Sequence, residues 1–272
     1  RWGWLATSIG WTLRFALILG VIGAGLLAVA WPLIEDGRRI GIEIKPIAVP
    51  AHLAENGLTP EIAANRLLDA IEAMGLSVLS SGRARSSKDG FGTLPQFAVT
   101  PDRPTLRHYA SLLRELRGLP LRQIAGDVVA RPDGTLDLRL RTPDSTSFAR
   151  AEGIPAATPD ALFTRAAPDV WRRANPLIYA WHIAETEPRE EEVRTRLVAL
   201  ARDMRMPPPT EVRVSVLYCR SLVRSGRAQE ALATLESLEK RDPGYPMLYH
   251  VKALALADLG KPDEALAAQR KA

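Results

Sequence analysis

Residues 226–266 read GRAQEALATLESLEKRDPGYPMLYHVKALALADLGKPDEAL and contain one pattern twice. Gly226 recurs as Gly260 and Ala231 recurs as Ala265, both after 34 residues. Glycine permits a tight turn between two helices, and alanine lets the second helix pack closely on the first. Pro243 follows Ala231 at the point where a unit would end. The pattern predicts two consecutive helix–turn–helix units.

This pattern resembles the tetratricopeptide repeat (TPR) over about residues 211–272. The resemblance is carried by Tyr218, Cys219, Gly226, Ala231 and Pro243 in the first unit and by Tyr249, Ala253, Gly260 and Ala265 in the second. Lys252 departs from the apolar residue that the family usually has there. The resemblance implies an α-helical TPR solenoid with a groove that binds a protein partner.

Solenoids of this kind need at least three units or a cap. Residues 158–206 predict further helices, which act either as a linker or as the capping first unit. Alternatively, more repeats follow Ala272, because the second unit stops before its own proline. The chain also begins with Arg1 rather than methionine, so we expect both ends to belong to something longer.

Residues 40–150 predict a small α/β domain with the order β-α-β-α-β-β. We expect strands at residues 40–49, 76–79, 123–130 and 136–141, a further strand at 94–99, and helices at 60–74 and 105–117. Thr59 and Pro60 suit the start of the first helix, and Gly75 suits its end. Pro132-Asp133-Gly134 predicts a hairpin between the last two strands.

Residues 40–170 resemble the α/β domain of the TolB amino-terminal and CsgG-like group, which also precedes TPR repeats in bacterial transmembrane proteins. The matching stretches are IKPIAVP at 44–50, GLTPEIAANRL at 57–67, YASLLRELRG at 109–118, IAGDVVARPDGTLDLRLR at 124–141 and DALFTRAAP at 160–168. The resemblance implies binding or assembly, no catalytic residues, and a position outside the inner membrane.

Residues 15–34 carry no charge, and twenty helical residues span about 30 Å, the thickness of a bilayer core. They predict a single transmembrane helix within an anchor at residues 1–36. A signal peptide is the competing interpretation, because Ala28-Val29-Ala30 imitates a cleavage site. Small residues line one face of the helix and predict contact with another membrane helix or a second copy: Ala16, Gly20, Gly23, Ala24 and Ala28.

The fold class predicted from these features is α+β: a transmembrane helix, a small α/β domain and a TPR solenoid. Flanking charges nearly balance, so the orientation follows from the resemblance of the middle domain. We expect a single-pass protein of the inner membrane whose bulk lies in the periplasm.

Composition and motifs limit the classes of function that the sequence supports. The net charge is +5, with 36 Lys and Arg against 31 Asp and Glu, and no basic run indicates nucleic-acid binding. The single cysteine and four histidines show no metal-ligand spacing, and no catalytic or cofactor motif occurs. We therefore expect no catalytic, cofactor-binding or metal-binding residues and no enzymatic activity.

The predicted function is a membrane-anchored TPR scaffold or accessory subunit in a bacterial membrane assembly. The alternative is the transmembrane and sensor portion of a signalling protein whose cytoplasmic effector precedes residue 1. An enzyme is the third hypothesis.

Overall fold

The computed structural model describes residues 41–80, 91, 94–99, 122–143, 146–204 and 206–272. Apart from Gly41, the described residues belong to one compact unit, Ile42–Thr100 with Arg122–Ala272. The architecture below is that of this unit, together with Gly41 at the start of its first strand.

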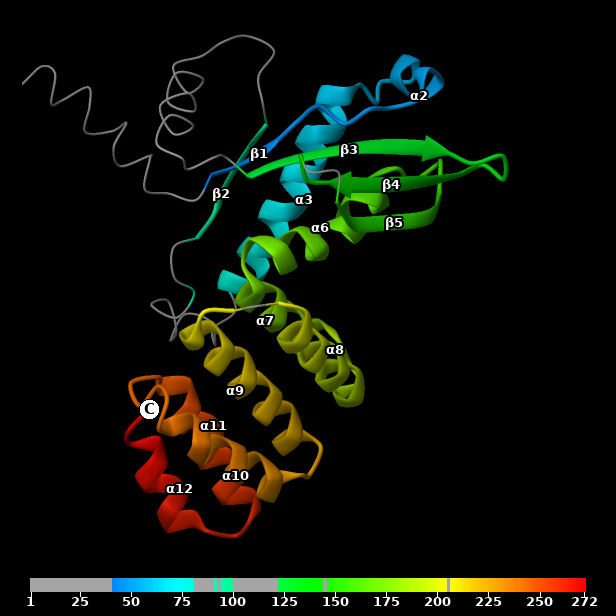
Figure 1. Ribbon diagram of the computed structural model, residues 1–272. Coiled ribbons are helices and arrows are strands. Elements are labelled where there is room, and N and C mark those ends of the chain that lie inside the picture. The colour runs from blue at the N-terminus through cyan, green and yellow to red at the C-terminus, as the bar shows by residue number, and fades with distance from the viewer. Residues whose placement is uncertain (1–40, 81–90, 92–93, 100–121, 144–145, 205) are drawn as a thin grey trace, which may run out of the picture. The chain divides into compact units, whose positions relative to one another are not determined.

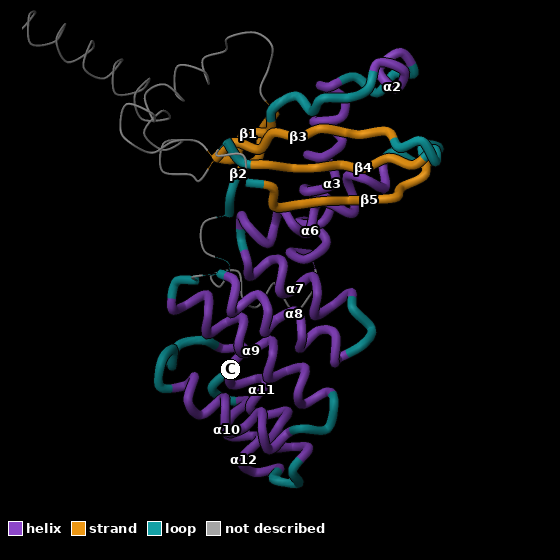
Figure 2. The backbone as a smooth tube through the Cα atoms, turned by 45° about the vertical axis from the view of Figure 1, so that its right-hand side comes forward, coloured by secondary structure: helices purple, strands orange, loops and turns teal. Residues whose placement is uncertain are grey.

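A five-stranded sheet has the strand order β2-β1-β3-β4-β5 (Figure 2). Its strands are β1 (Gly41–Ile44), β2 (Gln96–Val99), β3 (Arg122–Ala130), β4 (Thr135–Arg141) and β5 (Ser147–Pro155). β1 pairs with β3 in parallel, whereas β3, β4 and β5 are antiparallel neighbours. The hairpin predicted at Pro132-Asp133-Gly134 is confirmed, with Gly134 at a φ of +77°.

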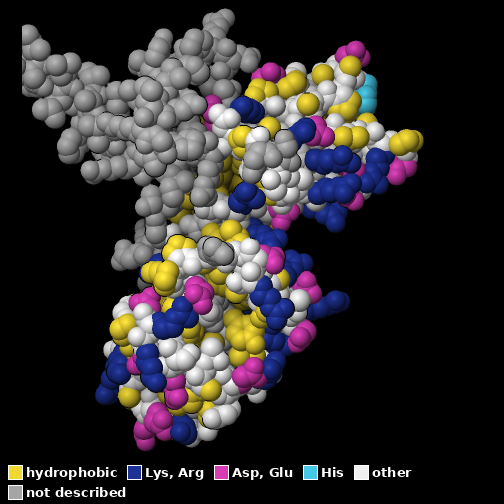
Figure 3. Space-filling view, viewed as in Figure 1, with side chains coloured by type: hydrophobic (Ala, Val, Ile, Leu, Met, Phe, Trp, Pro, Cys, Tyr) yellow, Lys and Arg dark blue, Asp and Glu magenta, His cyan; other side chains and the backbone are white. Residues whose placement is uncertain are grey.

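Helices cover one face of this sheet, as Figure 1 shows. After the short α2 (Ala51–Glu55), the long α3 (Pro60–Ser80) packs on β2 and on α6 (Asp160–Ala174), which in turn packs on β4 and β5. Leu136, Leu138 and Leu140 of β4 are fully buried on the core side. Arg139 and Arg141 alternate with them and are exposed. Figure 3 shows basic side chains gathered over β3 and β4 on the face that no described helix covers.

Six further helices form three successive pairs: α7 (Pro176–Thr186) with α8 (Glu190–Asp203), α9 (Pro208–Arg224) with α10 (Ala228–Glu239), and α11 (Pro246–Asp258) with α12 (Pro262–Gln269). The first helix of each pair contacts the first helix of the next, so α9 packs on both α7 and α11. Asn175 begins α7, because its Oδ1 accepts the backbone N–H groups of Leu177 and Ile178 at 3.2 and 3.4 Å. Burial of apolar side chains between neighbouring pairs holds the stack together.

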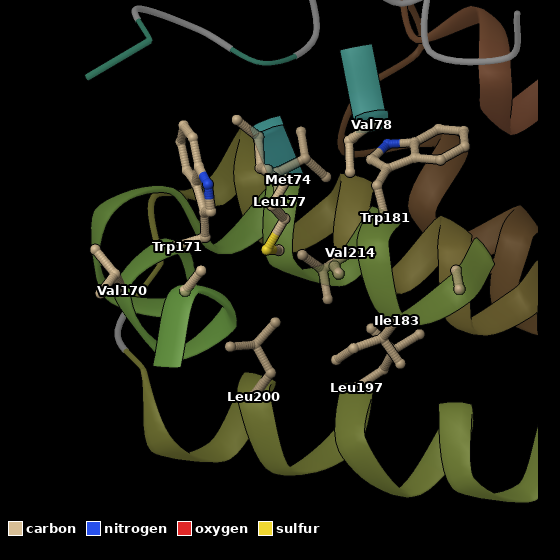
Figure 4. Packing of buried hydrophobic residues seen from close by; sticks show 14 of the residues in the cluster. Met74, Val78, Val170, Trp171, Leu177, Trp181, Ile183, Leu197, Leu200 and Val214 are labelled. Atoms are coloured by element: carbon tan, nitrogen blue, oxygen red, sulfur yellow. The ribbon is translucent and has the colours of Figure 1, made fainter. Parts of the chain in front are cut away.

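One continuous core joins the sheet layer to the helix pairs. Figure 4 shows Met74 and Val78 of α3 beside Leu177 and Trp181 of α7, with Val214 of α9 close by. Trp171 of α6 donates its Nε1–H to the carbonyl of Ile71 in α3 at 2.8 Å. α3 thus covers part of the buried surface of α7, and α6, α8 and α9 cover the rest.

The strand predicted at residues 76–79 is wrong, because α3 continues to Ser80. We expected Gly75 to end the helix. It is instead a close-packing site, where an added Cβ would lie 2.7 Å from Cζ2 of Trp171. Glycine is needed here for space, and the helix runs on through it.

The sequence did not predict β5, the outer strand of the sheet. Its residues SFARAEGIP contain two small alanines on the buried side, Ala149 and Ala151, rather than a row of large apolar residues. The register also shifts between Leu136 and Leu138, and Gly153 adopts a φ of +67° in the same region. The bulge interrupts the alternation of apolar and polar residues from which a strand is predicted.

The predicted fold class needs correction. The described residues form a mixed α/β structure with five strands and nine helices. Where the order β-α-β-α-β-β was predicted for residues 40–150, the described elements up to Pro155 follow the order β-α-α-β-β-β-β. From residue 41 onward, no described helix is both long and apolar enough to cross a bilayer. The transmembrane helix and the single-pass inner-membrane location were predicted from residues 15–34, and the periplasmic side from the resemblance of the middle domain. The described structure contains no element that supports these predictions. That segment, and the helix predicted at 105–117, lie outside the described residues.

Asp137 is a buried carboxylate on the otherwise polar face of β4, only 1 % exposed. Its Oδ2 accepts from Arg131 Nε at 2.8 Å, and its Oδ1 accepts from the N–H of Gly153 at 3.1 Å. Burial alone would raise the pKa of Asp137, but the hydrogen bonds from Arg131 and Gly153 and the charge of Arg131 together lower it. Asp137 thus ties the β3–β4 hairpin to the bulge in β5.

We predict that Asp137→Asn lowers the free energy of unfolding by about 1–3 kcal/mol at pH 7, because two donors lose a charged acceptor. Because the pKa of Asp137 is lower in the folded than in the unfolded protein, its ionised form stabilises the fold at pH values above the ordinary aspartate pKa of about 3.9. This contribution is lost as the pH falls through the folded-state pKa. In urea unfolding measured from pH 7 to pH 2.5, the free energies of unfolding of the wild type and the variant should therefore become equal at acid pH. Asp69→Asn on the exposed side of α3 is the control. Equal stability of both variants at pH 7 would contradict the assignment.

Candidate protein-binding surface

The turns between α9 and α10 and between α11 and α12 have the same geometry. Gly226 and Gly260 adopt φ values of +76° and +73°. Gly226 N–H donates to the carbonyl of Val223 at 2.9 Å, and Gly260 N–H donates to that of Ala257 at 3.0 Å. An ion pair follows each turn, Arg227 with Glu230 and Lys261 with Glu264. The repeat of 34 residues in the sequence is thus a repeat of local structure.

The small residues predicted at the helix contacts are buried. Cys219 and Ala231 are fully buried in the α9–α10 pair, and Ala253 and Ala265 are 6 % and 9 % exposed in the α11–α12 pair. Burial raises the pKa of the Cys219 thiol to about 12, so it is held as a neutral packing group. These four side chains occupy space that larger residues would not fit.

Of the remaining predicted residues, Pro243 and Tyr249 lie around the connection from α10 to α11, and Tyr218 lies on α9. Tyr249 is buried, and its hydroxyl donates to the carbonyl of Pro243 at 2.9 Å. Tyr218 is half-buried against the core. Lys252, which departs from the apolar residue of the TPR pattern, directs its Nζ to Glu239 at 2.7 Å. Its stem covers apolar surface while its charge reaches a partner on α10.

Helices α6 to α8 occupy the region predicted as a linker or cap. α6 belongs to the layer on the sheet, whereas α7 and α8 pack on α9. Val193 N–H donates to the carbonyl of Arg189 at 3.1 Å at the start of α8, as Ala231 N–H donates to that of Arg227 in α10. The α7–α8 pair precedes the α9–α10 pair in the stack, and Val193 holds the position at the start of α8 that Ala231 holds at the start of α10.

Three arginines follow one line along α9, and we call them the α9 row: Arg213, Arg220 and Arg224. Spacings of seven and eleven residues place them on one side of the helix. The guanidinium of Arg213 lies 5.4 Å from the ring centre of Tyr245, and that of Arg220 lies 5.5 Å from the ring centre of Trp181. Arg224 pairs with Glu190 at 2.8 Å. Aromatic rings at this distance attract a cation and fix its position.

The sequence analysis missed this row, because its three members are scattered among apolar residues that were assigned to packing. Their helical spacing was the available signal. Their aromatic partners were not predictable, since Trp181 comes from α7 and Tyr245 precedes α11. Burial raises the pKa of Tyr245 to about 12, so the ring beside Arg213 stays neutral. Trp181 is fully buried, and no described residue accepts its Nε1–H.

Side chains that could bind a metal ion are scattered in the described part of the chain. No group of three His, Cys, Asp or Glu residues is arranged there to hold a metal ion. Burial lowers the pKa of His182 and so favours its neutral form. His250 shares a hydrogen bond of 3.2 Å with Gln269. The small-residue positions predicted for membrane contact, Ala16, Gly20, Gly23, Ala24 and Ala28, lie outside the described residues.

Comparison with known proteins does not assign the chain to a family. No protein-family model matches the chain, and a search of curated proteins finds no significant sequence match. The TPR and TolB-like resemblances therefore stay predictions.

Glycine substitutions test the equivalence of the two turns. We predict that Gly226→Ala and Gly260→Ala each reduce the free energy of unfolding by about 1 kcal/mol, because alanine is strained at positive φ. An added Cβ meets no atom within 4 Å at either position, so the cost is conformational alone. Gly244→Ala is the matched control, with the same open space and no positive φ. Chemical denaturation should separate the two turn variants from the control, and a loss at only one turn would contradict the equivalence.

A bulky side chain tests the close contact between helices. We predict that Ala231→Trp unfolds or severely destabilises the helix pairs, because the site is fully buried and overpacking displaces both helices. Ala233→Trp on the exposed side of the same helix is the control. Melting followed by far-ultraviolet circular dichroism would report the difference. Similar melting temperatures for the two variants would contradict the assignment of Ala231 to a close contact between helices.

Proposed function

We propose that the chain is a protein-binding scaffold in which the sheet and its helices form a base and the stacked helix pairs hold a protein partner. The observation that carries this proposal is the succession of three pairs whose first helices, α7, α9 and α11, lie against one another in order. Such a stack presents one extended surface made from equivalent positions of successive pairs.

The α9 row suggests which part of this surface is used and by what chemistry. Arginine binds carboxylates through two parallel hydrogen bonds. An arginine side chain that already stacks on a ring has less conformational entropy to lose when it binds a partner. Arg213 is half-buried and Arg224 is exposed, so both ends of the row are reachable from solvent. Met247, Leu254 and Asp258 on α11 stand 34 residues after the three arginines of the row and hold the equivalent positions in the next helix pair. An acidic segment with an apolar residue beside it is the partner that fits.

The basic face of the sheet is a weaker candidate. Arg141 pairs with Asp127, and Arg150 pairs with Glu152, which also contacts Arg131. These carboxylates offset part of the arginine charge, as Glu190 does for Arg224 of the α9 row. What Arg131, Arg141 and Arg150 lack, among the described residues, is an aromatic ring like those beside Arg213 and Arg220. The sheet face is therefore useful mainly as a comparison surface of similar composition.

The test is co-purification with the full chain as bait, using two variants that each remove two positive charges. Arg213→Gln with Arg224→Gln changes the α9 row, and Arg139→Gln with Arg150→Gln changes the sheet face. We predict that the proteins recovered with the wild type are retained by the sheet variant and depleted about 10-fold or more by the row variant, since each charge-assisted hydrogen bond adds about 1.5–3 kcal/mol.

Two results would contradict the proposal. One is equal recovery with both variants, provided that their melting temperatures match that of the wild type. The other is that the wild type enriches no protein over an unrelated bait of the same charge. A direct binding measurement between the purified chain and any recovered protein would then fix the stoichiometry.

A further inference from the structure

One carboxylate already lies on the α9 row and comes from the neighbouring helix pair. Glu190, in the first turn of α8, places its Oε1 at 2.8 Å from Nε of Arg224. Its Oε2 accepts the hydroxyl of Ser221 at 2.7 Å, so α9 holds this carboxylate at two points. The side chain of Glu190 is 18 % exposed, whereas that of Arg224 is 50 % exposed. The most exposed arginine of the row therefore has an acidic group bound to it.

The stacking of helix pairs does not require an acid at the position of Glu190. Val193 in α8 corresponds to Ala231 in α10. Three residues earlier, Glu190 corresponds to Ala228, and the same position in α12 is Pro262. Ala228 is buried with no charge to satisfy. The acid thus belongs to the contact with α9 rather than to the architecture of a helix pair.

The start of α8 offers another reason for an acidic residue, because a negative charge near a helix N-terminus is stabilising. Three acids share that first turn: Glu190, Glu191 and Glu192. Glu191 and Glu192 pair with arginines of α8 itself, whereas Glu190 reaches across to α9. The helix dipole therefore accounts for the acids as a group, and the direction of Glu190 needs a separate explanation.

The contact of Arg224 also differs in kind from those that fix the rest of the row. Arg213 and Arg220 lie beside aromatic rings, which hold a guanidinium without cancelling its charge. The carboxylate of Glu190 offsets the charge of Arg224 and occupies one edge of its guanidinium. A partner carboxylate that binds Arg224 must share it with Glu190, and two like charges at that range repel each other.

We propose that Glu190 is a built-in competitor that lowers the affinity of the α9 row for an acidic partner. This inference rests on the proposed function and adds its regulation. A bound partner takes Arg224 away from Glu190, while the hydrogen bond from Ser221 keeps the released carboxylate on α9. The competitor thereby raises the affinity that an acidic segment must have before it occupies the row.

The test measures binding of the purified full chain to a fluorescein-labelled peptide in which pairs of glutamates alternate with leucine, followed by fluorescence anisotropy. Glu190→Gln should bind this peptide about 3- to 10-fold more tightly than the wild type, because it frees Arg224 and removes a like charge. Glu192→Gln is the matched control, since it removes an acid of the same turn that also pairs with an arginine. Its affinity should equal that of the wild type.

A double variant shows whether the gain depends on Arg224. Arg224→Gln alone should weaken binding of the peptide. Adding Glu190→Gln to it should change the affinity by less than about 2-fold, because the guanidinium for which the two carboxylates compete is absent. An equal gain from Glu190→Gln with and without Arg224 would show a general effect of charge and would overturn the competitor.

The remaining outcomes separate this inference from the function on which it rests. Unchanged or weaker binding by Glu190→Gln would overturn the competitor and would make Glu190 a group that positions Arg224. The proposed function would stand in that case, provided that Arg213→Gln with Arg224→Gln still loses the peptide. A peptide that binds neither the wild type nor Glu190→Gln would overturn the competitor together with the acidic partner of the proposed function.

Displacement of Glu190 has a readout of its own in the Nε–H signal of Arg224 in a proton–nitrogen NMR spectrum. Arg224→Gln identifies this signal by its absence. Saturating peptide should shift the signal in the wild type, because the Nε–H exchanges the carboxylate of Glu190 for the peptide. A wild-type signal that stays in place while the peptide is bound would overturn the displacement.

Discussion

The contact between Trp171 and the backbone of α3 determines how the rest of the structure is arranged. The indole lies where a side chain on Gly75 would stand, and its Nε1–H donates to the carbonyl of Ile71 at 2.8 Å. This fixes α6 on α3 near the end of α6. Asn175 follows within one turn and begins α7, and its Nδ2 also donates to the carbonyl of Phe91 at 3.1 Å. The direction of the whole helix stack therefore follows from one aromatic residue and one glycine.

The turns at Gly226 and Gly260 were predictable because their determinants are local. Gly226 and Gly260 act through their own φ angles, and Ala231 and Ala265 act through contacts with the preceding helix. The hairpin at Pro132-Asp133-Gly134 is local for the same reason. The errors arose where distant residues decide the outcome. Gly75 was interpreted as a helix end because its partner, Trp171, lies almost a hundred residues further on. β5 was missed because its alanines face α6 and its alternation is broken by a bulge.

The candidate surface was only partly predictable for a related reason. Helical spacing alone aligns Arg213, Arg220 and Arg224, but their significance depends on rings from α7 and from the segment before α11. Equivalent positions of two pairs can also differ, since Leu232 is buried and Leu266 is 54 % exposed although both follow the same sequence pattern. Stacked pairs make such comparisons informative, because each pair shows what its neighbour should cover.

The most direct test of the account is hydrogen exchange on Gly75→Ala. In an exposed helix this change would stabilise by up to about 1 kcal/mol, because alanine is the better helix former. Against Trp171, the added Cβ would lie 2.7 Å from Cζ2. We predict that amide protection falls together in β4, around Leu138, and in α9, around Leu217, because both depend on the α3–α6 contact. Higher protection, or a loss in β4 alone, would contradict the central position of that contact.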